Sequence, residues 1–240
     1  MVAKVIADMS PKGGVGKTTT SVNIAATLAS LGKKTLIIDA NLETPHVAIY
    51  FGFVGYKYSL EDVFNSSVPV EYAIYKTDVN NLHILPSRVF KGRGDGNARY
   101  KIINLFYQIQ KVERNYDFII IDSKPSYDVD FVKAIRGISA IIVSVPEITA
   151  MIEARKLNDE LRSSGVNVLG LVMNRYDRRI RDRVGEREAS EITGISNTWI
   201  VPEDKSLYSA LKQGLPVVLW DRKLASSRAF FELAGSLVGE

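Results

Sequence analysis

A glycine-rich turn between an apolar run and a helical pattern constrains this chain more than any other feature. Residues 4–19 read KVIADMSPKGGVGKTT, and the apolar stretch breaks at Gly13, Gly14 and Gly16. This order predicts a strand, a tight loop and a helix in immediate succession. The backbone N–H groups of such a loop point at one anion, and the helix that follows adds the positive end of its dipole. The sequence therefore predicts a phosphate-binding loop.

Two side chains at the end of the loop extend this prediction to a nucleotide with its magnesium ion. The ammonium group of Lys17 can reach terminal phosphates, and the hydroxyl of Thr18 can ligate Mg²⁺. Pro11 has no backbone N–H to donate, so we do not expect it to contact a phosphate. The other positions expected to contact the nucleotide in this loop are Gly13, Gly14, Val15, Gly16 and Thr19.

The rest of the chain alternates apolar strand patterns with segments of helical length. Such alternation predicts a mainly parallel sheet that is covered by helices on both faces. With 240 residues, 46% of them hydrophobic, we expect residues 1–240 to form one α/β domain with a doubly wound sheet of about seven strands. The expected central strands are 5–9, 35–39, 116–122, 138–145 and 166–173, and the expected peripheral strands are 71–77 and 81–85.

Two of the central strands end in an aspartate. Asp39 closes one apolar run and Asp122 closes another. The carboxyl ends of parallel strands meet at the edge of the sheet where ligands bind. We therefore expect both carboxylates to organise Mg²⁺ and its water molecules beside Thr18.

The run from Lys12 to Thr19 resembles the deviant Walker A motif of the MinD/ParA group of P-loop ATPases, and the chain is most similar to MinD-like members. In that family the extra lysine, here Lys12, reaches across a dimer to the nucleotide of the other subunit. The resemblance implies an ATP hydrolase that binds ATP or ADP with Mg²⁺ and forms a homodimer when ATP is bound. It implies a switch in division-site placement or DNA partition, controlled by an activating protein partner. The candidate catalytic residues are Lys12, Lys17, Asp39 and Asn41.

The base-binding part of the site is also implied by the resemblance. Residues 173–175 resemble the segment that recognises adenine in this family, which makes Asn174 the residue that reads the base and Arg175 its neighbour. An amide side chain offers both a donor and an acceptor, as the edge of adenine requires. Pro202 would flank the adenine ring.

Asn41 is a departure from the family pattern. The family's switch I segment usually reads Asp-x-Asp, but here Asp39 is followed by Asn41. An amide can hold a water molecule by hydrogen bonds, but it cannot accept the proton of that water. Two alternatives stay open: an ordinary, slow ATPase that tolerates Asn41, or an ATP-bound scaffold or regulator with little hydrolysis.

DNA is a further candidate partner, as in ParA-type partition proteins. Residues 175–187 carry six arginines, but Asp177, Asp182 and Glu186 interrupt them. The arginines favour sequence-independent phosphate contacts, whereas the acids favour a solvated surface with internal ion pairs. The net charge of +4 permits nonspecific DNA binding without arguing for it. Residues 91–99 predict a second basic loop, rich in glycine.

Composition excludes several other classes of protein. There is no cysteine, so disulfides and thiolate metal sites are ruled out. No apolar run approaches the roughly 20 residues of a membrane span, and the first strand leaves no room for a signal peptide. The last expected helix, 224–238, is followed by no basic amphipathic tail, so we do not expect membrane binding. These features predict a cytoplasmic protein.

Overall fold

The computed structural model describes residues 2–89, 98–124 and 138–239, and it is built around one eight-stranded sheet. The strand order is β3-β4-β2-β5-β1-β6-β7-β8. All neighbouring strands are parallel except β3 and β4, which are antiparallel. The strands are β1 (Lys4–Met9), β2 (Thr35–Asp39), β3 (Tyr75–Lys76), β4 (Leu82–Leu85), β5 (Phe118–Asp122), β6 (Ser139–Ser144), β7 (Asn167–Tyr176) and β8 (Thr198–Pro202).

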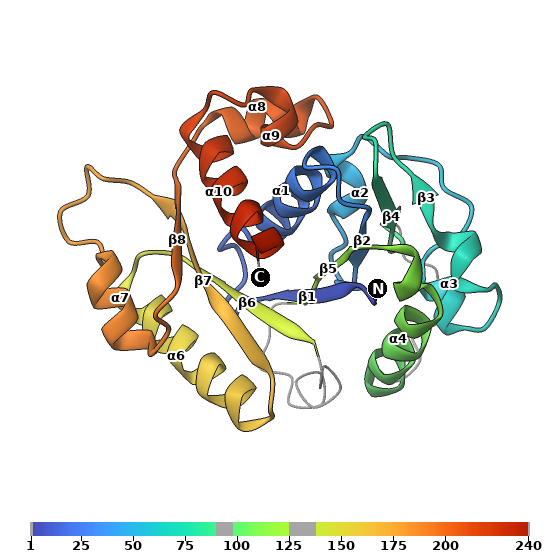
Figure 1. Cartoon of the computed structure of the whole chain (residues 1–240), viewed down its shortest axis with the longest axis horizontal. Helices are drawn as coiled ribbons and strands as arrows, with labels where there is room; N and C mark the ends of the chain where they lie inside the picture. Colours follow the sequence, from blue (N-terminus) through green and yellow to red (C-terminus); the bar gives the residue numbers. More distant parts are fainter. Residues whose placement is uncertain (1, 90–97, 125–137, 240) are drawn as a thin grey trace.

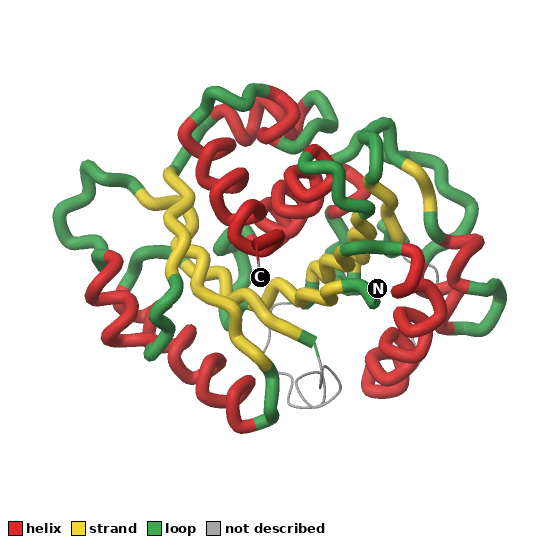
Figure 2. Tube along the Cα trace, viewed as in Figure 1, coloured by secondary structure: helices red, strands yellow, loops and turns green. Residues whose placement is uncertain are grey.

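Helices cover both faces of this sheet, as Figures 1 and 2 show. Buried side chains of α1, α2, α8, α9 and α10 pack on one face, and those of α3, α4, α6 and α7 pack on the other. This confirms the doubly wound α/β fold. The helices are α1 (Lys17–Ser30), α2 (Val47–Tyr50), α3 (Leu60–Phe64), α4 (Ala98–Val112), α6 (Ile148–Ser163), α7 (Glu186–Thr193), α8 (Ser206–Lys212), α9 (Val217–Trp220) and α10 (Ala225–Gly239).

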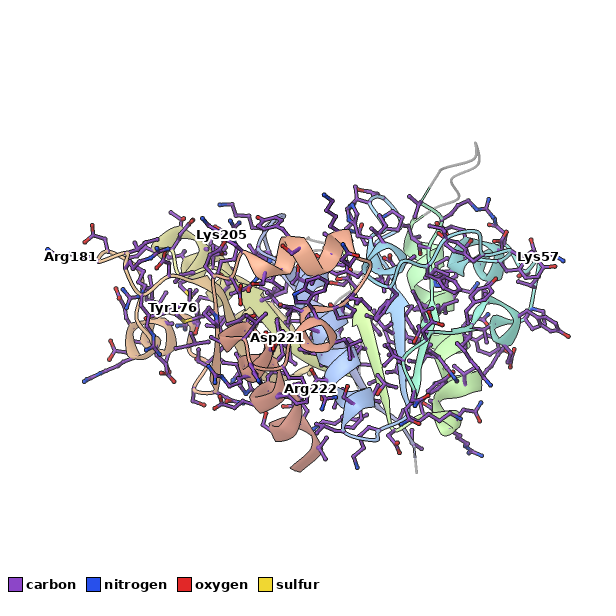
Figure 3. All side chains as sticks on the ribbon, turned by 90° about the horizontal axis from the view of Figure 1, so that it is seen from above. Lys57, Tyr176, Arg181, Lys205, Asp221 and Arg222 are labelled. Atoms are coloured by element: carbon purple, nitrogen blue, oxygen red, sulfur yellow. The ribbon has the colours of Figure 1, made fainter. Side chains whose placement is uncertain are left out.

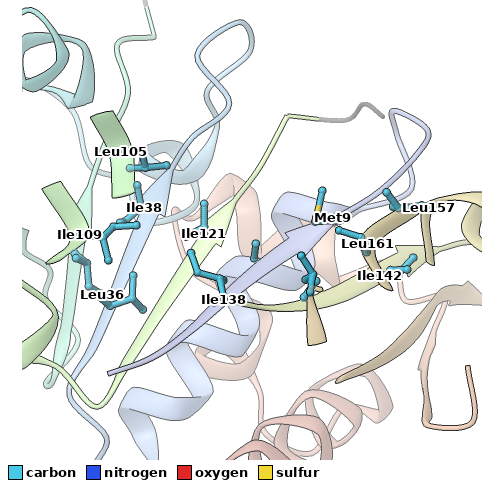
Figure 4. Packing of buried hydrophobic residues seen from close by; sticks show 14 of the residues in the cluster. Met9, Leu36, Ile38, Leu105, Ile109, Ile121, Ile138, Ile142, Leu157 and Leu161 are labelled. Atoms are coloured by element: carbon cyan, nitrogen blue, oxygen red, sulfur yellow. The ribbon is translucent and has the colours of Figure 1, made fainter. Parts of the chain in front are cut away.

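The central strands are mostly apolar because both of their faces are buried. In β1, Ala7 and Met9 pack with the α4 and α6 side of the core, whereas Ile6 packs with the α1 side. Figure 4 shows the first of these clusters, in which Met9 and Ile142 lie near Leu157 of α6. Because both faces are apolar, no period-two alternation marks these strands in the sequence.

The periphery differs from the sequence expectation. The sheet has eight strands instead of about seven. Residues 70–73, which overlap the start of the expected strand 71–77, form a 3₁₀ turn, and only Tyr75–Lys76 pair with β4. Most of the basic loop at 91–99 lies outside the described residues. Within the described residues, no helix is both long and apolar enough to cross a bilayer.

The topology decides where a ligand site can form. From β1 the chain moves to β2 on one side, whereas β6, β7 and β8 extend the sheet on the other side. The strand order therefore reverses at β1, and the crevice at such a point is where α/β sheets bind ligands. The glycine-rich loop leaves the carboxyl end of β1 at this crevice. The register also places Asp39 and Asp8 on either side of Asp122.

Candidate functional site

The glycine-rich loop has the backbone of an anion-binding turn. Gly14 and Gly16 have φ angles of 80° and 90°, which only glycine adopts without strain. Gly16 precedes the first residue of α1, and no side chain caps that helix end. The first N–H groups of α1 are therefore not bonded by a capping side chain and point toward the loop. This backbone agrees with the predicted phosphate cradle.

Lys17 is buried and contacts Asp122, the aspartate that ends β5. Its Nζ atom donates a hydrogen bond to Oδ1 of Asp122 at 2.7 Å and another to the backbone carbonyl of Ser123. Thr18 donates its hydroxyl to the other oxygen of Asp122, at 2.6 Å. The fold thus brings Asp122 to Lys17 and Thr18, which lie 105 and 104 positions before it in the sequence. Removing either member of this buried ion pair would leave an uncompensated charge.

Asp39 lies beside Asp122 at the end of β2. Its carboxylate accepts hydrogen bonds from the backbone N–H of Val47, at 3.0 Å, and of Asn41, at 3.2 Å. Burial, followed by the nearby charge of Asp122, raises the pKa of Asp39 well above its usual value. A dication would favour the ionised form of both carboxylates, so this pair fits the predicted magnesium site.

Asp8 is a third buried carboxyl group at this edge, and the sequence analysis did not single it out. It lies next to Asp122 on the neighbouring strand and is fully buried. Neither of its oxygen atoms has a hydrogen-bond partner among the described residues. Burial raises the pKa of Asp8 to about 7, and the charge of Asp122 acts in the same direction. The signal in the sequence was an aspartate inside an otherwise apolar strand.

Asn41 is buried and is engaged with its own turn. Its Nδ2 donates to the hydroxyl of Thr44 at 3.0 Å, and its Oδ1 accepts from the backbone N–H of Thr44 at 3.3 Å. The nearby Glu43 forms an ion pair with Lys124. Polar contacts therefore stabilise the turn that follows β2, and both Nδ2 and Oδ1 of Asn41 take part in them. Residues 125–137, which follow Lys124, lie outside the described residues.

Asn174 reaches the phosphate-binding loop from β7. Its Nδ2 donates to the backbone carbonyl of Val15 at 2.8 Å, while its buried Oδ1 has no partner among the described residues. Arg175 has a φ of 57° and pairs with Glu203 at 3.1 Å. A small cavity of about 150 Å³ adjoins these residues. It is lined by Gly14, Gly16, Thr19, Tyr50, Asn174, Arg175, Glu203, Asp204, Leu207, Tyr208 and Leu211.

Pro202 and Lys12 lie at the margins of this arrangement. Pro202 ends β8 and lines a neighbouring hollow instead of the cavity that holds Asn174. Lys12 is exposed, and its Nζ lies 4.0 Å from Oε2 of Glu147, at the start of α6. An exposed pair at this distance adds little stability, so the Lys12 side chain is free to reorient.

Three of the six arginines at 175–187, namely Arg175, Arg179 and Arg187, pair with acids of the same chain. Arg179 pairs with Asp177 at 2.7 Å, and Arg187 pairs with Glu191 at 3.0 Å. The guanidinium group of Arg183 stacks over the ring of Tyr176. Figure 3 shows Arg181 at the outermost edge of the molecule. These ion pairs favour the solvated surface over a continuous DNA-binding stripe.

The comparisons with known proteins agree with this geometry. The doubly wound sheet, with its glycine loop at the switch point and a buried lysine on the aspartate of β5, defines a P-loop nucleotide-binding protein. The model of the AAA domain family matches residues 3–163. The MinD cell division ATPase of Pyrococcus furiosus is 28% identical, with 99% of each chain covered and a TM-score of 0.88.

Two further solved structures add ligand and partner information about relatives. The septum site-determining protein MinD of Pyrococcus horikoshii, complexed with Mg-ADP, is 28% identical over 98% of this chain and 96% of its own, with a TM-score of 0.87. The MinD of Aquifex aeolicus in its MinC:MinD complex is 30% identical over 99% of this chain and 96% of its own, also with a TM-score of 0.87. The chain therefore belongs to the MinD/ParA family of P-loop ATPases.

Proposed function

We propose that this chain binds ATP with Mg²⁺, hydrolyses it slowly, and acts as a nucleotide-dependent switch in spatial positioning or partitioning. The observation that carries the proposal is the buried cluster of Lys17, Thr18 and Asp122 beneath an uncapped helix end. These are the groups that a phosphate-bound magnesium ion requires, and the fold has already brought them into contact. The Mg-ADP complex of the Pyrococcus horikoshii relative supports the same choice of ligand.

Different residues of the site would bind the phosphates, the metal ion and the base. The loop amides and Lys17 would hold the phosphates, while Thr18, Asp39 and Asp122 would hold Mg²⁺ directly or through water. Asn174 would face the base, because its Oδ1 is buried and still has no hydrogen-bond partner among the described residues. When bound, the metal ion supplies charge neutralisation for phosphoryl transfer.

Dimerisation would depend on Lys12. Its side chain is exposed and only loosely paired with Glu147, so it is available to a second copy of the chain. Light scattering after gel filtration should show a dimer with ATP and Mg²⁺ and a monomer with ADP. With Lys12→Ala the dimer should be lost while ADP binding stays, because ADP binding does not need the second subunit. An ATP-dependent dimer of undiminished stability in that variant would refute the role of Lys12.

A second candidate function is an ATP-bound scaffold or regulator with little hydrolysis. The observation that favours it is the Asn41 amide, which cannot take a proton and is bonded at both ends to Thr44. Single-turnover hydrolysis at saturating Mg²⁺, wild type beside Asn41→Asp, separates the two candidates. Turnover by the wild type with little change in the variant supports the slow ATPase. ATP held unhydrolysed by the wild type, with turnover restored by the aspartate, supports the scaffold.

A further inference from the structure

The cavity beside the phosphate-binding loop is too small for a nucleoside. Its volume is about 150 Å³, whereas small-molecule sites measure roughly 300–1,000 Å³. Its walls come from the loop, from β7, from α8 and from Tyr50 at the end of α2. If the base and ribose enter here, at least one wall has to move. Asn174 bonds to a backbone carbonyl of the loop, whereas Tyr50 bonds to a side chain that is expected to contact the nucleotide.

The hydroxyl of Tyr50 shares a hydrogen bond of 2.6 Å with the hydroxyl of Thr19. Burial raises the pKa of Tyr50, so the phenol stays neutral and able to donate at ordinary pH. Thr19 is one of the residues assigned to the nucleotide, and its hydroxyl is therefore occupied when the site is closed. A phosphate oxygen can only accept, so a nucleotide that bonds to Thr19 needs the Thr19 proton and competes with Tyr50 when Thr19 is the donor of the shared bond.

The short helix α2 is tied at both of its ends to the nucleotide site. At its start, the N–H of Val47 donates to Oδ2 of Asp39 at 3.0 Å. At its end, Tyr50 bonds to Thr19. Just beyond the helix, Gly52 packs against Gly214, where an added Cβ would lie 2.8 Å from the Gly52 backbone. The segment just beyond α2 thus contacts the turn that follows α8, and α8 itself supplies another wall of the same cavity.

We propose that Tyr50 is a latch that competes with the nucleotide for Thr19 and thereby couples nucleotide binding to the position of α2. The proposal rests on the proposed function, since it concerns the regulation of the same site. In the closed state Tyr50 holds Thr19 and narrows the cavity. Nucleotide binding breaks this bond, and α2 then keeps the hydrogen bond to Asp39 at its start and its packing in the core. Tyr50 is thus a positioning residue and contributes no contact to the nucleotide.

The test is MgADP binding to the wild type and to Tyr50→Phe, measured by isothermal titration calorimetry. The phenylalanine keeps the ring and removes only the bond that binding has to break, so the dissociation constant should fall about threefold to tenfold. Tyr75→Phe is the matched control, because the Tyr75 hydroxyl bonds to the backbone of Tyr58, away from the cavity. Its dissociation constant for MgADP should equal that of the wild type.

Each result of the titration bears on the latch. Weaker binding by Tyr50→Phe would mean that the hydroxyl contacts the nucleotide, which overturns the competition. Equal binding by the variant and the wild type overturns the latch alone and leaves the proposed function in place. Failure of the wild type to bind MgADP overturns the proposed function together with the latch.

Hydrogen exchange of the wild-type chain gives a second measurement that needs no variant. The N–H groups of Phe51 and Phe53 bond to the carbonyl of Ala48 and report on the end of α2. MgADP should speed the exchange of these two amides severalfold, because release of Tyr50 loosens the helix end. Exchange that is unchanged or slowed by MgADP contradicts the proposal.

Discussion

At the scale of single residues, Asp8 affects the stability of the folded protein. It is fully buried and has no hydrogen-bond partner among the described residues, and Asp122 lies on the adjacent strand. A buried carboxyl group without a partner is more stable protonated, so its pKa of about 7 lies above the 3.8 of an ordinary aspartate. Asp8 is therefore expected to lower the stability of the nucleotide-free protein at neutral pH.

The sign of this effect predicts a pH dependence. Below about pH 4 Asp8 is protonated in both the folded and the unfolded chain. Between about pH 4 and 7 only the unfolded chain loses the proton, so the folded state becomes less stable by up to about 4 kcal/mol as the pH rises. Asp8→Asn should remove this loss and raise the free energy of unfolding by roughly 1–4 kcal/mol at pH 8, but not at pH 4. Urea unfolding at both pH values measures it.

Asp62 is a matched control with the opposite sign. Burial opposes ionisation there, but hydrogen bonds from Arg88 and Ser59 lower the pKa of Asp62. Asp62→Asn should therefore destabilise the protein at pH 8 and much less at pH 3. If Asp8→Asn lost stability at pH 8 in the same way, the interpretation of Asp8 as an unpartnered acid would be wrong.

At the scale of elements, β7, which carries Asn174, packs closely on β8. Gly170 lies in β7 where its register with β6 shifts, and the ring of Trp199 in β8 packs directly on its backbone. An added Cβ at Gly170 would lie 2.5 Å from Trp199 and 2.8 Å from the carbonyl oxygen of Asn197. The close approach of these two strands therefore requires a glycine.

The prediction at this scale is that Gly170→Ala forces the two strands apart. Overpacking of this kind costs about 1–3 kcal/mol, which denaturant unfolding would show as a lower midpoint. Gly235→Ala is the control, because Gly235 lies in α10 with open space around its Cα. That exchange should raise the free energy of unfolding by about 0.5–1 kcal/mol. A neutral Gly170→Ala would contradict the packing argument.

For the whole molecule, the buried charges link folding to ligand binding. The nucleotide-free site holds Asp8, Asp39 and Asp122 within one edge of the sheet, with Lys17 as their cation. A ligand that binds only the folded chain stabilises it, by about 2.7 kcal/mol at a hundred times its dissociation constant. Mg²⁺ in particular would offset the repulsion among the carboxylates.

We therefore expect MgADP at that excess to raise the melting temperature by about 5–10 °C. ADP with a chelator should give a smaller rise, because the carboxylates then lack their dication. Lys17→Ala should show no rise with either ligand. Differential scanning calorimetry checks all three expected melting temperatures. A wild-type melting temperature that does not change with MgADP would count against nucleotide binding.

Much of the fold was predictable because its signals are local. The sequence itself shows a glycine-rich loop between a strand and a helix, and apolar runs that end in aspartate. The strand expected at 35–39 has the same bounds in the structure. The strand that the sequence analysis missed is β8, because its apolar run spans only Trp199 to Val201 before Pro202 ends it. Asp8 was missed because a single polar residue in an apolar run does not reveal which neighbours the sheet will give it.

What the sequence by itself determined is the class of the protein, because loop chemistry and strand endings are properties of short segments. Only the tertiary structure decided the contacts between segments that lie far apart in the chain. It placed Lys17 on Asp122, Asn174 against the phosphate-binding loop and Tyr50 on Thr19. The physical reason is that strand order and register fix these pairs, and both are set by packing across the whole sheet.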